Sequence, residues 1–275
     1  MATMNLERKS GLLEAELRSY GRVAVAFSGG VDSTLLLKVA VETLGAGCVM
    51  AIMADSPSMP RREIAAAELL AESMGVELVL VKTDELSDSN YVANSVERCY
   101  FCKRVIFKAI KEVATQRGFM VCCDGTNSDD SGDWRPGARA VRESGACSPL
   151  AAAGFTKEEV RALSQSLRLP TATKPAMACL ASRIPYGSAV TAEVLAQIEA
   201  AEEALVQMGF SVVRVRHHGE VARIELGADE MERMLASETR SAVTAALRDV
   251  GYTYVALDLA GYRSGSLNAK LKGRP

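Results

Sequence analysis

The chain has 275 residues, with 32 lysines and arginines against 34 aspartates and glutamates and a net charge of -2. This balance is unlike that of a strongly basic nucleic-acid-binding protein, and an aromatic content of 5% argues against a platform for stacking single-stranded bases. No apolar stretch approaches the roughly 20 residues that cross a bilayer, and the first residues do not resemble a signal peptide. We therefore expect a cytoplasmic protein with no membrane and no nucleic-acid partner.

The first part of the chain predicts strands that alternate with helices. An opening helix would carry four apolar residues on one face, namely Leu6, Leu12, Leu13 and Leu17. Strands are expected at 22–27, 49–54, 76–81 and 120–123, and helices at 32–44, 61–74, 103–116 and 156–167. In the last of these helices, Thr156 and Glu159 have the spacing of a capping box. The alternation is typical of an α/β fold with a doubly wound, mainly parallel sheet.

The pattern changes after a long loop at 171–187, which has no sustained period and carries two prolines. Beyond it we expect a helix at 191–208, a hairpin at 211–226, a helix at 229–250 broken near Ser237, and a last strand at 254–257. The sequence therefore predicts two domains. Residues 1–182 would hold the parallel sheet, and residues 183–275 would form a smaller α+β domain for substrate binding or oligomerisation.

A glycine loop with the sequence Ser-Gly-Gly-Val-Asp-Ser, at 28–33, joins the first strand to its helix. The first amides of a helix are unpaired and favour anions, and glycines let the backbone approach a phosphate closely. Ser28 and Ser33 add hydroxyl donors, and Asp32 adds a carboxylate that can hold Mg²⁺ between phosphates. Because the loop lacks the lysine of a Walker A motif, it suits pyrophosphate as a leaving group.

The chain contains seven cysteines, which in a reducing compartment argue against a disulfide framework. Cys99 and Cys102 form a C-x-x-C pair just before a predicted helix, and Cys179 lies in the long loop. Such a pair suits a metal ion or an iron–sulfur cluster, and the helix N-terminus with its basic neighbours would favour the thiolate. Three cysteines can hold a [4Fe–4S] cluster with one open iron that carries sulfide. Unligated cysteines are the alternative interpretation.

The other candidate metal ligands and cysteines have weaker patterns. A four-ligand zinc site has little support, because His217 and His218 are adjacent in a strand and would point to opposite faces. Cys122 and Cys123 are expected in the core as small apolar residues. The sequence assigns no role to the remaining two cysteines, Cys48 and Cys147.

The 28–33 loop resembles the PP-loop of N-type ATP pyrophosphatases, a group that includes NAD synthetase, GMP synthetase, asparagine synthetase and tRNA thiolation enzymes. The resemblance implies an adenine nucleotide alpha hydrolase-like fold for residues 1–182. It also implies that an oxygen of the substrate attacks the α-phosphate of ATP, giving an adenylate and pyrophosphate. The implied ATP-binding residues are Ser28, Gly29, Gly30, Asp32, Ser33, Asp124, Gly125 and Thr126, with Mg²⁺ on Asp32.

The run 174–187 resembles the sulfur-donor loop of LarE-type sulfur transferases, and the runs 134–137, 213–217, 222–226 and 257–265 resemble the same family. The similarity thus covers nearly the whole chain. It implies adenylation of a pyridinium carboxylate mononucleotide, followed by replacement of the activated oxygen with sulfur. The product belongs to the biosynthesis of the nickel-pincer cofactor of lactate racemase. The resemblance also implies a homo-oligomer and, as partners, other proteins of that biosynthesis.

The sulfur source distinguishes two branches of that family. In one branch the cysteine matching Cys179 gives up its own sulfur, and counterparts of Cys99 and Cys102 are absent. This sequence has both, so it resembles the branch in which three cysteines hold a [4Fe–4S] cluster that delivers sulfide. Whether Cys179 is the donor or a cluster ligand stays open, and so does the origin of the replenishing sulfide.

Arginines are the candidates for gripping a substrate phosphate and carboxylates, because a guanidinium binds such groups bidentately. The candidate substrate-binding residues are Ser182, Arg183, Arg214 and Arg216, with Glu202 and Glu225 as weaker candidates. Strand alternation places Arg214 and Arg216 on a polar side, where a solvated face is the alternative. Three other functions remain open: tRNA thiolation, amide-forming ligation of the NAD synthetase kind, and nucleotide binding without catalysis.

Overall fold

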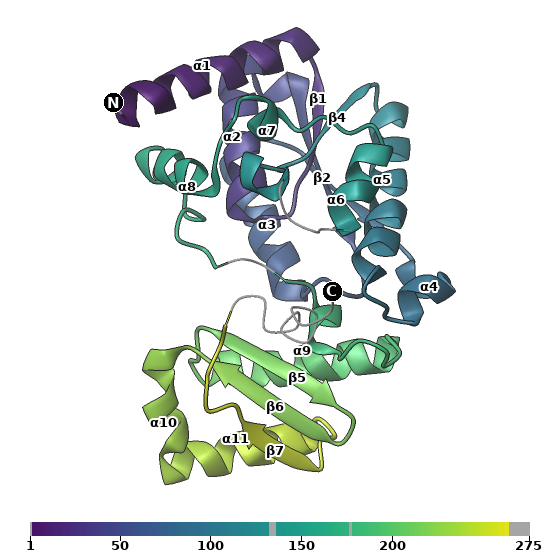
Figure 1. The fold of residues 1–275 in the computed structure, drawn as a ribbon, viewed down its shortest axis with the longest axis vertical. Coiled ribbons are helices and arrows are strands. Elements are labelled where there is room, and N and C mark those ends of the chain that lie inside the picture. Colours follow the sequence, from purple (N-terminus) through teal and green to yellow (C-terminus); the bar gives the residue numbers. More distant parts are fainter. Residues whose placement is uncertain (1, 132–135, 176–177, 264–275) are drawn as a thin grey trace, which may run out of the picture. The chain divides into compact units, whose positions relative to one another are not determined.

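The computed structural model describes residues 2–131, 136–175 and 178–263, and it divides the chain into two compact units (Figure 1). The first unit comprises residues 1–91 and 96–177, and the second comprises 92–95 and 178–275. The sequence places the boundary between 182 and 183. The segment 92–95 packs with the second unit because the Asn94 side-chain amide donates to the carbonyls of Pro185 (2.8 Å) and Ser188 (2.9 Å).

The first unit is built on a four-stranded parallel sheet in the order β3-β2-β1-β4. Its strands are β1 Val23–Ala26, β2 Val49–Asp55, β3 Leu78–Lys82 and β4 Val121–Cys123. The register aligns Val23 of β1 with Val49 of β2 and Val121 of β4. The sequences of β1 and β2 are almost entirely apolar because helices cover both faces of these strands. The predicted α/β fold with a parallel sheet is therefore confirmed.

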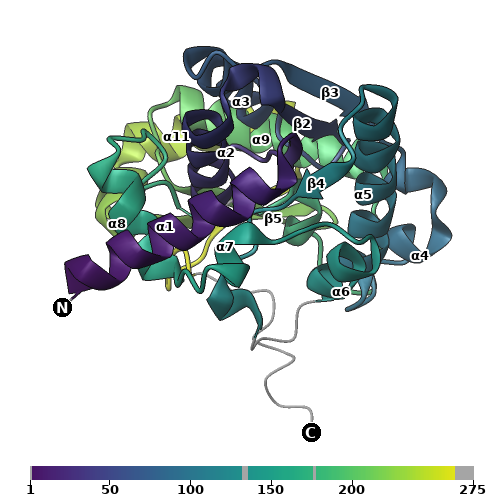
Figure 2. The ribbon, with the colours of Figure 1, turned by 90° about the horizontal axis from the view of Figure 1, so that it is seen from above.

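Helices pack on both faces of this sheet (Figure 2). One face is covered by α1 Ala2–Tyr20, α2 Val31–Leu44, α3 Arg61–Ser73, α7 Pro149–Ala152 and α8 Lys157–Ser166. The other face is covered by α5 Arg98–Gln116, against which α6 Pro136–Glu143 packs, and α4 Ser89–Val92 precedes α5 in the chain. Leu13 and Leu17 of α1 are buried as predicted, but Leu12 is 49% exposed, so the apolar face of α1 is narrower than the sequence suggests.

The capping box at the start of α8 is confirmed. The Thr156 hydroxyl accepts from the Glu159 amide (3.2 Å), and the Glu159 carboxylate accepts from the Thr156 amide (2.9 Å). Lys9 of α1 pairs with the same carboxylate and also donates to the Gly154 carbonyl (2.7 Å). The first helix is thereby bonded to the helix that begins beside the glycine loop.

The second unit combines a three-stranded sheet with helices. Its elements are a short 3-10 helix Leu180–Arg183, α9 Ala192–Gln207, β5 Val213–His218, β6 Val221–Leu226, α10 Met231–Leu235, α11 Ser237–Asp249 and β7 Tyr254–Leu257. β5 and β6 form the predicted antiparallel hairpin, which turns at Gly219 with φ 63°. The predicted helix break is confirmed, since Ala236 is extended. β7 pairs with β6 in parallel, so α10 and α11 form a crossover. No helix in the described ranges is both long and apolar enough to cross a membrane.

Candidate functional site

The glycine loop forms the start of α2 at the carboxyl end of β1. Gly30 is the N-cap, and Gly29 has φ +67°, a conformation that glycine adopts without steric cost. The Ser28 and Ser33 hydroxyls lie 3.1 Å apart, and Ser33 Oγ also accepts from the Ser28 amide (3.2 Å). The loop therefore gathers two hydroxyls beside the unpaired first amides of a helix, which is the arrangement of an anion site.

The second polar loop, Asp124–Asn127, lies directly against the first. A Cβ on Gly125 would come within 2.8 Å of the Ser33 amide nitrogen, so only glycine permits this approach. Asn127 donates its side-chain amide to Asp32 (3.0 Å). Asp124 is buried and accepts from the hydroxyls of Thr126 and Ser148, so it orders its own loop. The structure thus brings the two predicted ATP-binding loops together.

Two lysines that the sequence analysis did not select lie at the glycine loop. Lys157, at the first position of α8, pairs with the Asp32 carboxylate, 125 residues away in the chain. Lys174 donates to the Gly29 carbonyl (3.0 Å) and pairs with Glu63 of α3 (2.6 Å). Lys157 lies in no predicted motif, and Lys174 begins the run 174–187 without any signal that it contacts the glycine loop, because the partners of both lysines are distant in sequence. They supply the positive charge that the loop itself lacks.

The donor chemistry at Asp32 fits a magnesium ion. Mg²⁺ prefers carboxylate oxygens together with phosphate oxygens and waters, and Asp32 places a half-buried carboxylate at the mouth of the loop. Its two oxygens accept from Asn127 and Lys157, so the carboxylate is already oriented. The acids that follow the second loop bond to backbone amides: Asp129 accepts from Lys157 (2.8 Å) and Asp130 from Asn127 (3.2 Å).

The C-x-x-C pair lies inside a helix rather than before one. α5 begins at Arg98 and not at Lys103 as predicted, so Cys99 and Cys102, three residues apart, lie on one face near its N-terminus. Cys99 is exposed, and the half-buried Cys102 has its sulfur 3.9 Å from the carboxylate of buried Glu85. Cys179 is the N-cap of the 3-10 helix in the other unit. Within the described ranges, no three His, Cys, Asp or Glu side chains form a group that could hold a metal ion.

The remaining cysteines lie away from solvent to differing degrees. Cys122 and Cys123 are buried in β4 as predicted, and burial raises the pKa of both thiols. Cys147 is half-buried and pairs with Cys123 in an isolated parallel bridge, and Cys48 is half-buried after α2. Cys122 and Cys123 therefore have the character of core residues.

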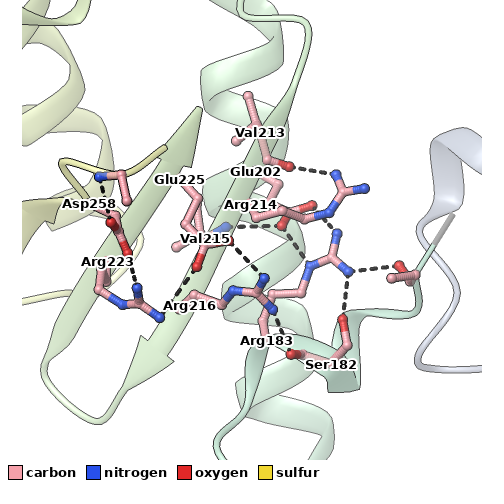
Figure 3. Close-up of polar contacts among 12 residues, drawn as sticks. Ser182, Arg183, Glu202, Val213, Arg214, Val215, Arg216, Arg223, Glu225 and Asp258 are labelled. Atoms are coloured by element: carbon pink, nitrogen blue, oxygen red, sulfur yellow. Dashed lines mark hydrogen bonds and ion pairs between the residues drawn. The ribbon is translucent and has the colours of Figure 1, made fainter. Parts of the chain in front are cut away.

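Arg183 organises the backbone around Cys179 (Figure 3). Its Nη1 donates to the carbonyls of Ala178 (2.7 Å) and Cys179 (3.0 Å) and to the Ser182 hydroxyl (2.9 Å). Its Nε and Nη2 donate to the two oxygens of Glu202 (2.8 and 3.1 Å), and Arg183 and Glu202 are each 1% exposed. The guanidinium therefore holds the cysteine loop to α9, a structural role that the sequence does not predict.

The arginines of β5 also differ from the expected solvated face. Arg216 is buried, pairs with buried Glu225 (2.7 Å) and donates to the Ser182 carbonyl (2.8 Å). Arg214 is half-buried and donates to the Val213 carbonyl (2.7 Å), and its guanidinium carbon lies 5.2 Å from the centre of the Tyr262 ring. Figure 3 shows that Arg183, from the short 3-10 helix, and Arg216, from β5, both donate to oxygens of Ser182. The predicted alternative of a solvated strand face is wrong at Arg216.

Parts of the motifs singled out by the sequence lie outside the described residues. These are Trp134 and Arg135 of the run 134–137, Ala176 and Met177 of the cysteine loop, and Ser264 and Gly265.

Comparison of the sequence with known proteins identifies the family of this chain. Residues 7–183, more than half of the chain, match the NAD synthase family. A pyridinium-3,5-bisthiocarboxylic acid mononucleotide synthase of Lactiplantibacillus plantarum is 40% identical over 271 residues, which cover 98% of this chain and 97% of that protein.

Two further relatives differ in the share of this chain that they match. An uncharacterized protein of Synechocystis is 41% identical over 97% of this chain and 99% of its own length. An NH(3)-dependent NAD(+) synthetase of Chlorobaculum tepidum is 26% identical over 44% of this chain and 49% of its own length. The chain belongs to the NAD synthase family of PP-loop proteins and, over its full length, to the family that includes the pyridinium-3,5-bisthiocarboxylic acid mononucleotide synthase.

Proposed function

We propose that this protein is an ATP-dependent sulfur transferase that adenylates a pyridinium carboxylate mononucleotide and replaces the activated oxygen with sulfur. The observation that carries the proposal is the close packing of the two loops, in which Gly125 approaches the Ser33 amide beside the Asp32 carboxylate. Similarity to the Lactiplantibacillus synthase along the whole chain supports the same substrate class. The product would serve the nickel-pincer cofactor of lactate racemase.

The first chemical step follows from the loop. A substrate carboxylate oxygen attacks the α-phosphorus of ATP, the bond from that phosphorus to the bridging oxygen breaks, and pyrophosphate leaves. The amides at the start of α2 and the Ser28 and Ser33 hydroxyls would receive the negative charge of the leaving group. A magnesium ion on Asp32 would supply charge neutralisation between the phosphates.

The second step is the capture of the adenylate by sulfur. A sulfur nucleophile attacks the activated carbonyl carbon, the carbon–oxygen bond to the phosphate breaks, and AMP leaves. Holding the two reactants in place can contribute about 7–11 kcal/mol to such a step. Arg183, anchored to Glu202, holds the backbone of the Cys179 loop for this purpose. Ser182, Arg214 and Arg216 remain our candidates for binding the substrate phosphate and carboxylates.

For the sulfur source we propose a [4Fe–4S] cluster, which Cys99, Cys102 and Cys179 would hold and which would supply sulfide to the adenylate. The placement of Cys99 and Cys102 on one face of α5, near its N-terminus, supports this choice. Anaerobic reconstitution should then give brown protein with about four irons per chain, and Cys99→Ala should abolish both. Colourless wild-type protein in which mass spectrometry finds dehydroalanine at Cys179 would instead identify that cysteine as the donor.

The overall activity is tested by supplying purified protein with ATP, Mg²⁺ and a carboxylated pyridine mononucleotide. We expect release of pyrophosphate and AMP, and a thiocarboxylate product detected by mass spectrometry. Deamido-NAD with ammonia serves as the control substrate for amide ligation, and bulk tRNA for RNA thiolation. Turnover of either control, without turnover of the mononucleotide, would contradict the proposal. Light scattering of the same sample tests the homo-oligomer that we propose alongside it.

A further inference from the structure

The peptide between Gly29 and Gly30 has its two polar groups in different environments. The Gly29 carbonyl accepts from Lys174 (3.0 Å). The Gly30 amide faces the Ser28 hydroxyl (3.4 Å), which lies beside the Ser33 hydroxyl. In a planar trans peptide the C=O and N–H point in opposite directions, so fixing the carbonyl also fixes the direction of the amide. The contact from Lys174 therefore orients Gly30 N–H toward the hydroxyls that line the anion site.

This orientation needs a restraint because glycine leaves it free. Gly29 has φ +67° and no side chain, so rotation of the following peptide meets little steric resistance. A rotated peptide would aim the Gly29 carbonyl oxygen at the site, where it would repel a phosphate. The ammonium of Lys174 opposes that rotation, since it would lose a charge-assisted hydrogen bond.

Both the side chain and the backbone of Lys174 are held by neighbouring residues. Its ammonium pairs with Glu63 (2.6 Å) in the first turn of α3, the helix whose Ala67 packs within 3.3 Å of a Cβ position on Gly29. Its backbone carbonyl accepts from Arg161 of α8 (2.9 Å). The lysine thus has a defined position relative to the loop before any ligand binds.

We propose that Lys174 is a positioning residue for the pyrophosphate loop, acting through the Gly29 carbonyl to present the Gly30 amide to the leaving group. Lys174 also precedes Cys179 by five residues, so the same segment restrains the ATP loop and leads to the sulfur-donor loop. This inference rests on the proposed function, since it assigns the leaving group of ATP to the loop.

The test compares ligands with and without a pyrophosphate group by calorimetry on the full chain. For Lys174→Met we expect affinity for inorganic pyrophosphate and for ATP to fall about tenfold, the value of one charge-assisted hydrogen bond, while AMP affinity changes less than about twofold. Lys174→Arg should recover part of the loss. Lys38→Met is the matched control, because Lys38 lies on α2 and its ammonium pairs with Glu42 of the same helix (2.9 Å).

Glu63→Gln separates positioning from direct phosphate binding. If Lys174 acts through the Gly29 carbonyl, loss of its partner loosens the lysine, and pyrophosphate affinity falls. Tighter pyrophosphate binding by Glu63→Gln would show a lysine released to bind phosphate directly and would overturn the inference. Unchanged ATP-to-AMP affinity ratios in Lys174→Met and Glu63→Gln would also overturn it. Wild-type protein that binds neither ATP nor pyrophosphate would instead refute the proposed function on which the inference rests.

Discussion

The two units use charged side chains in opposite ways. At the glycine loop, the paired side chains keep contact with solvent, with 36% and 22% exposed for Lys157 and Asp32 and 25% and 18% for Lys174 and Glu63. In the second unit, Arg183 and Glu202 are each 1% exposed. Half-solvated pairs contribute little to stability, whereas a buried pair cannot lose one member without a large desolvation penalty. The pairs at the glycine loop are therefore available to orient the loop, whereas the Arg183–Glu202 pair holds the fold of the second unit.

The strongest way to break this comparison is to remove one member of the buried pair. We expect Arg183→Met to destabilise the second unit by about 3–5 kcal/mol, because Glu202 is left charged and buried. The measurement is denaturant unfolding combined with hydrogen exchange of β5, whose Val215 amide donates to Glu202 (3.0 Å). The double variant Arg183→Met/Glu202→Met should regain most of the stability. A loss below about 1 kcal/mol in the single variant would show that the pair behaves like a surface ion pair.

The close approach of the two ATP loops gives the next largest effect. Gly125→Ala would place a methyl group 2.8 Å from the Ser33 amide, so we expect a loss of about 1–3 kcal/mol from overpacking and little pyrophosphate release. Unfolding and a pyrophosphate assay measure the two effects. Gly11→Ala is the matched control, because a Cβ there meets nothing within 4 Å and should be neutral or stabilising. Normal pyrophosphate release by Gly125→Ala would contradict the assigned role of this contact.

Each unit has a helix whose N-terminus is capped by a threonine, and replacing these two residues compares the units directly. Thr156 caps α8 and Thr191 caps α9, where its hydroxyl accepts from the Val194 amide (3.3 Å). Replacing either with alanine should cost about 1 kcal/mol. Only Thr156→Ala should weaken ATP binding, since α8 carries Lys157 at its first position. Equal ATP affinities in the two variants would mean that α8 does not position Lys157 for the loop.

The smallest expected effect is a pH dependence in the second unit. Burial lowers the pKa of His217, whose Nδ1 lies 3.2 Å from the Tyr252 hydroxyl. The folded state favours the neutral form of His217. The contribution of this residue to the free energy of unfolding is therefore complete above the ordinary pKa of about 6.5, and it is lost as pH falls below that value. The stability of His217→Gln should therefore depend less on pH than that of wild type between pH 7.5 and 5.5.

Titration by NMR follows the same group directly and should give His217 a pKa below the ordinary value of about 6.5. A His217 pKa at or above that value would contradict the assignment.

The sequence reveals most of the first unit because its signals are local. The strand, the glycine pair and the helix around residues 28–33 are contiguous, so the loop could be predicted, as could the parallel sheet that carries it. The predicted start of α5 is five residues late because its N-cap, Glu97, makes no side-chain capping bond.

What the sequence could not reveal depends on tertiary neighbours. Lys174 finds Gly29 across 145 residues, which no periodicity records. The alternation of polar and apolar residues in β5 does not distinguish a polar face in water from a buried one. Arg216 lies on such a buried face, where it contacts Glu225 and the Ser182 carbonyl.

The bond between α1 and α8 has a practical consequence for anyone who shortens or tags this protein. Glu159 serves both as the capping-box carboxylate of α8 and as the partner of Lys9, and α8 begins with the lysine that holds Asp32. Trimming the first helix would therefore expose Glu159 to competing cations and loosen the helix start beside the nucleotide loops. A truncated variant that fails to bind ATP should accordingly be compared with Lys9→Met in the full chain before the loss is attributed to the loops themselves.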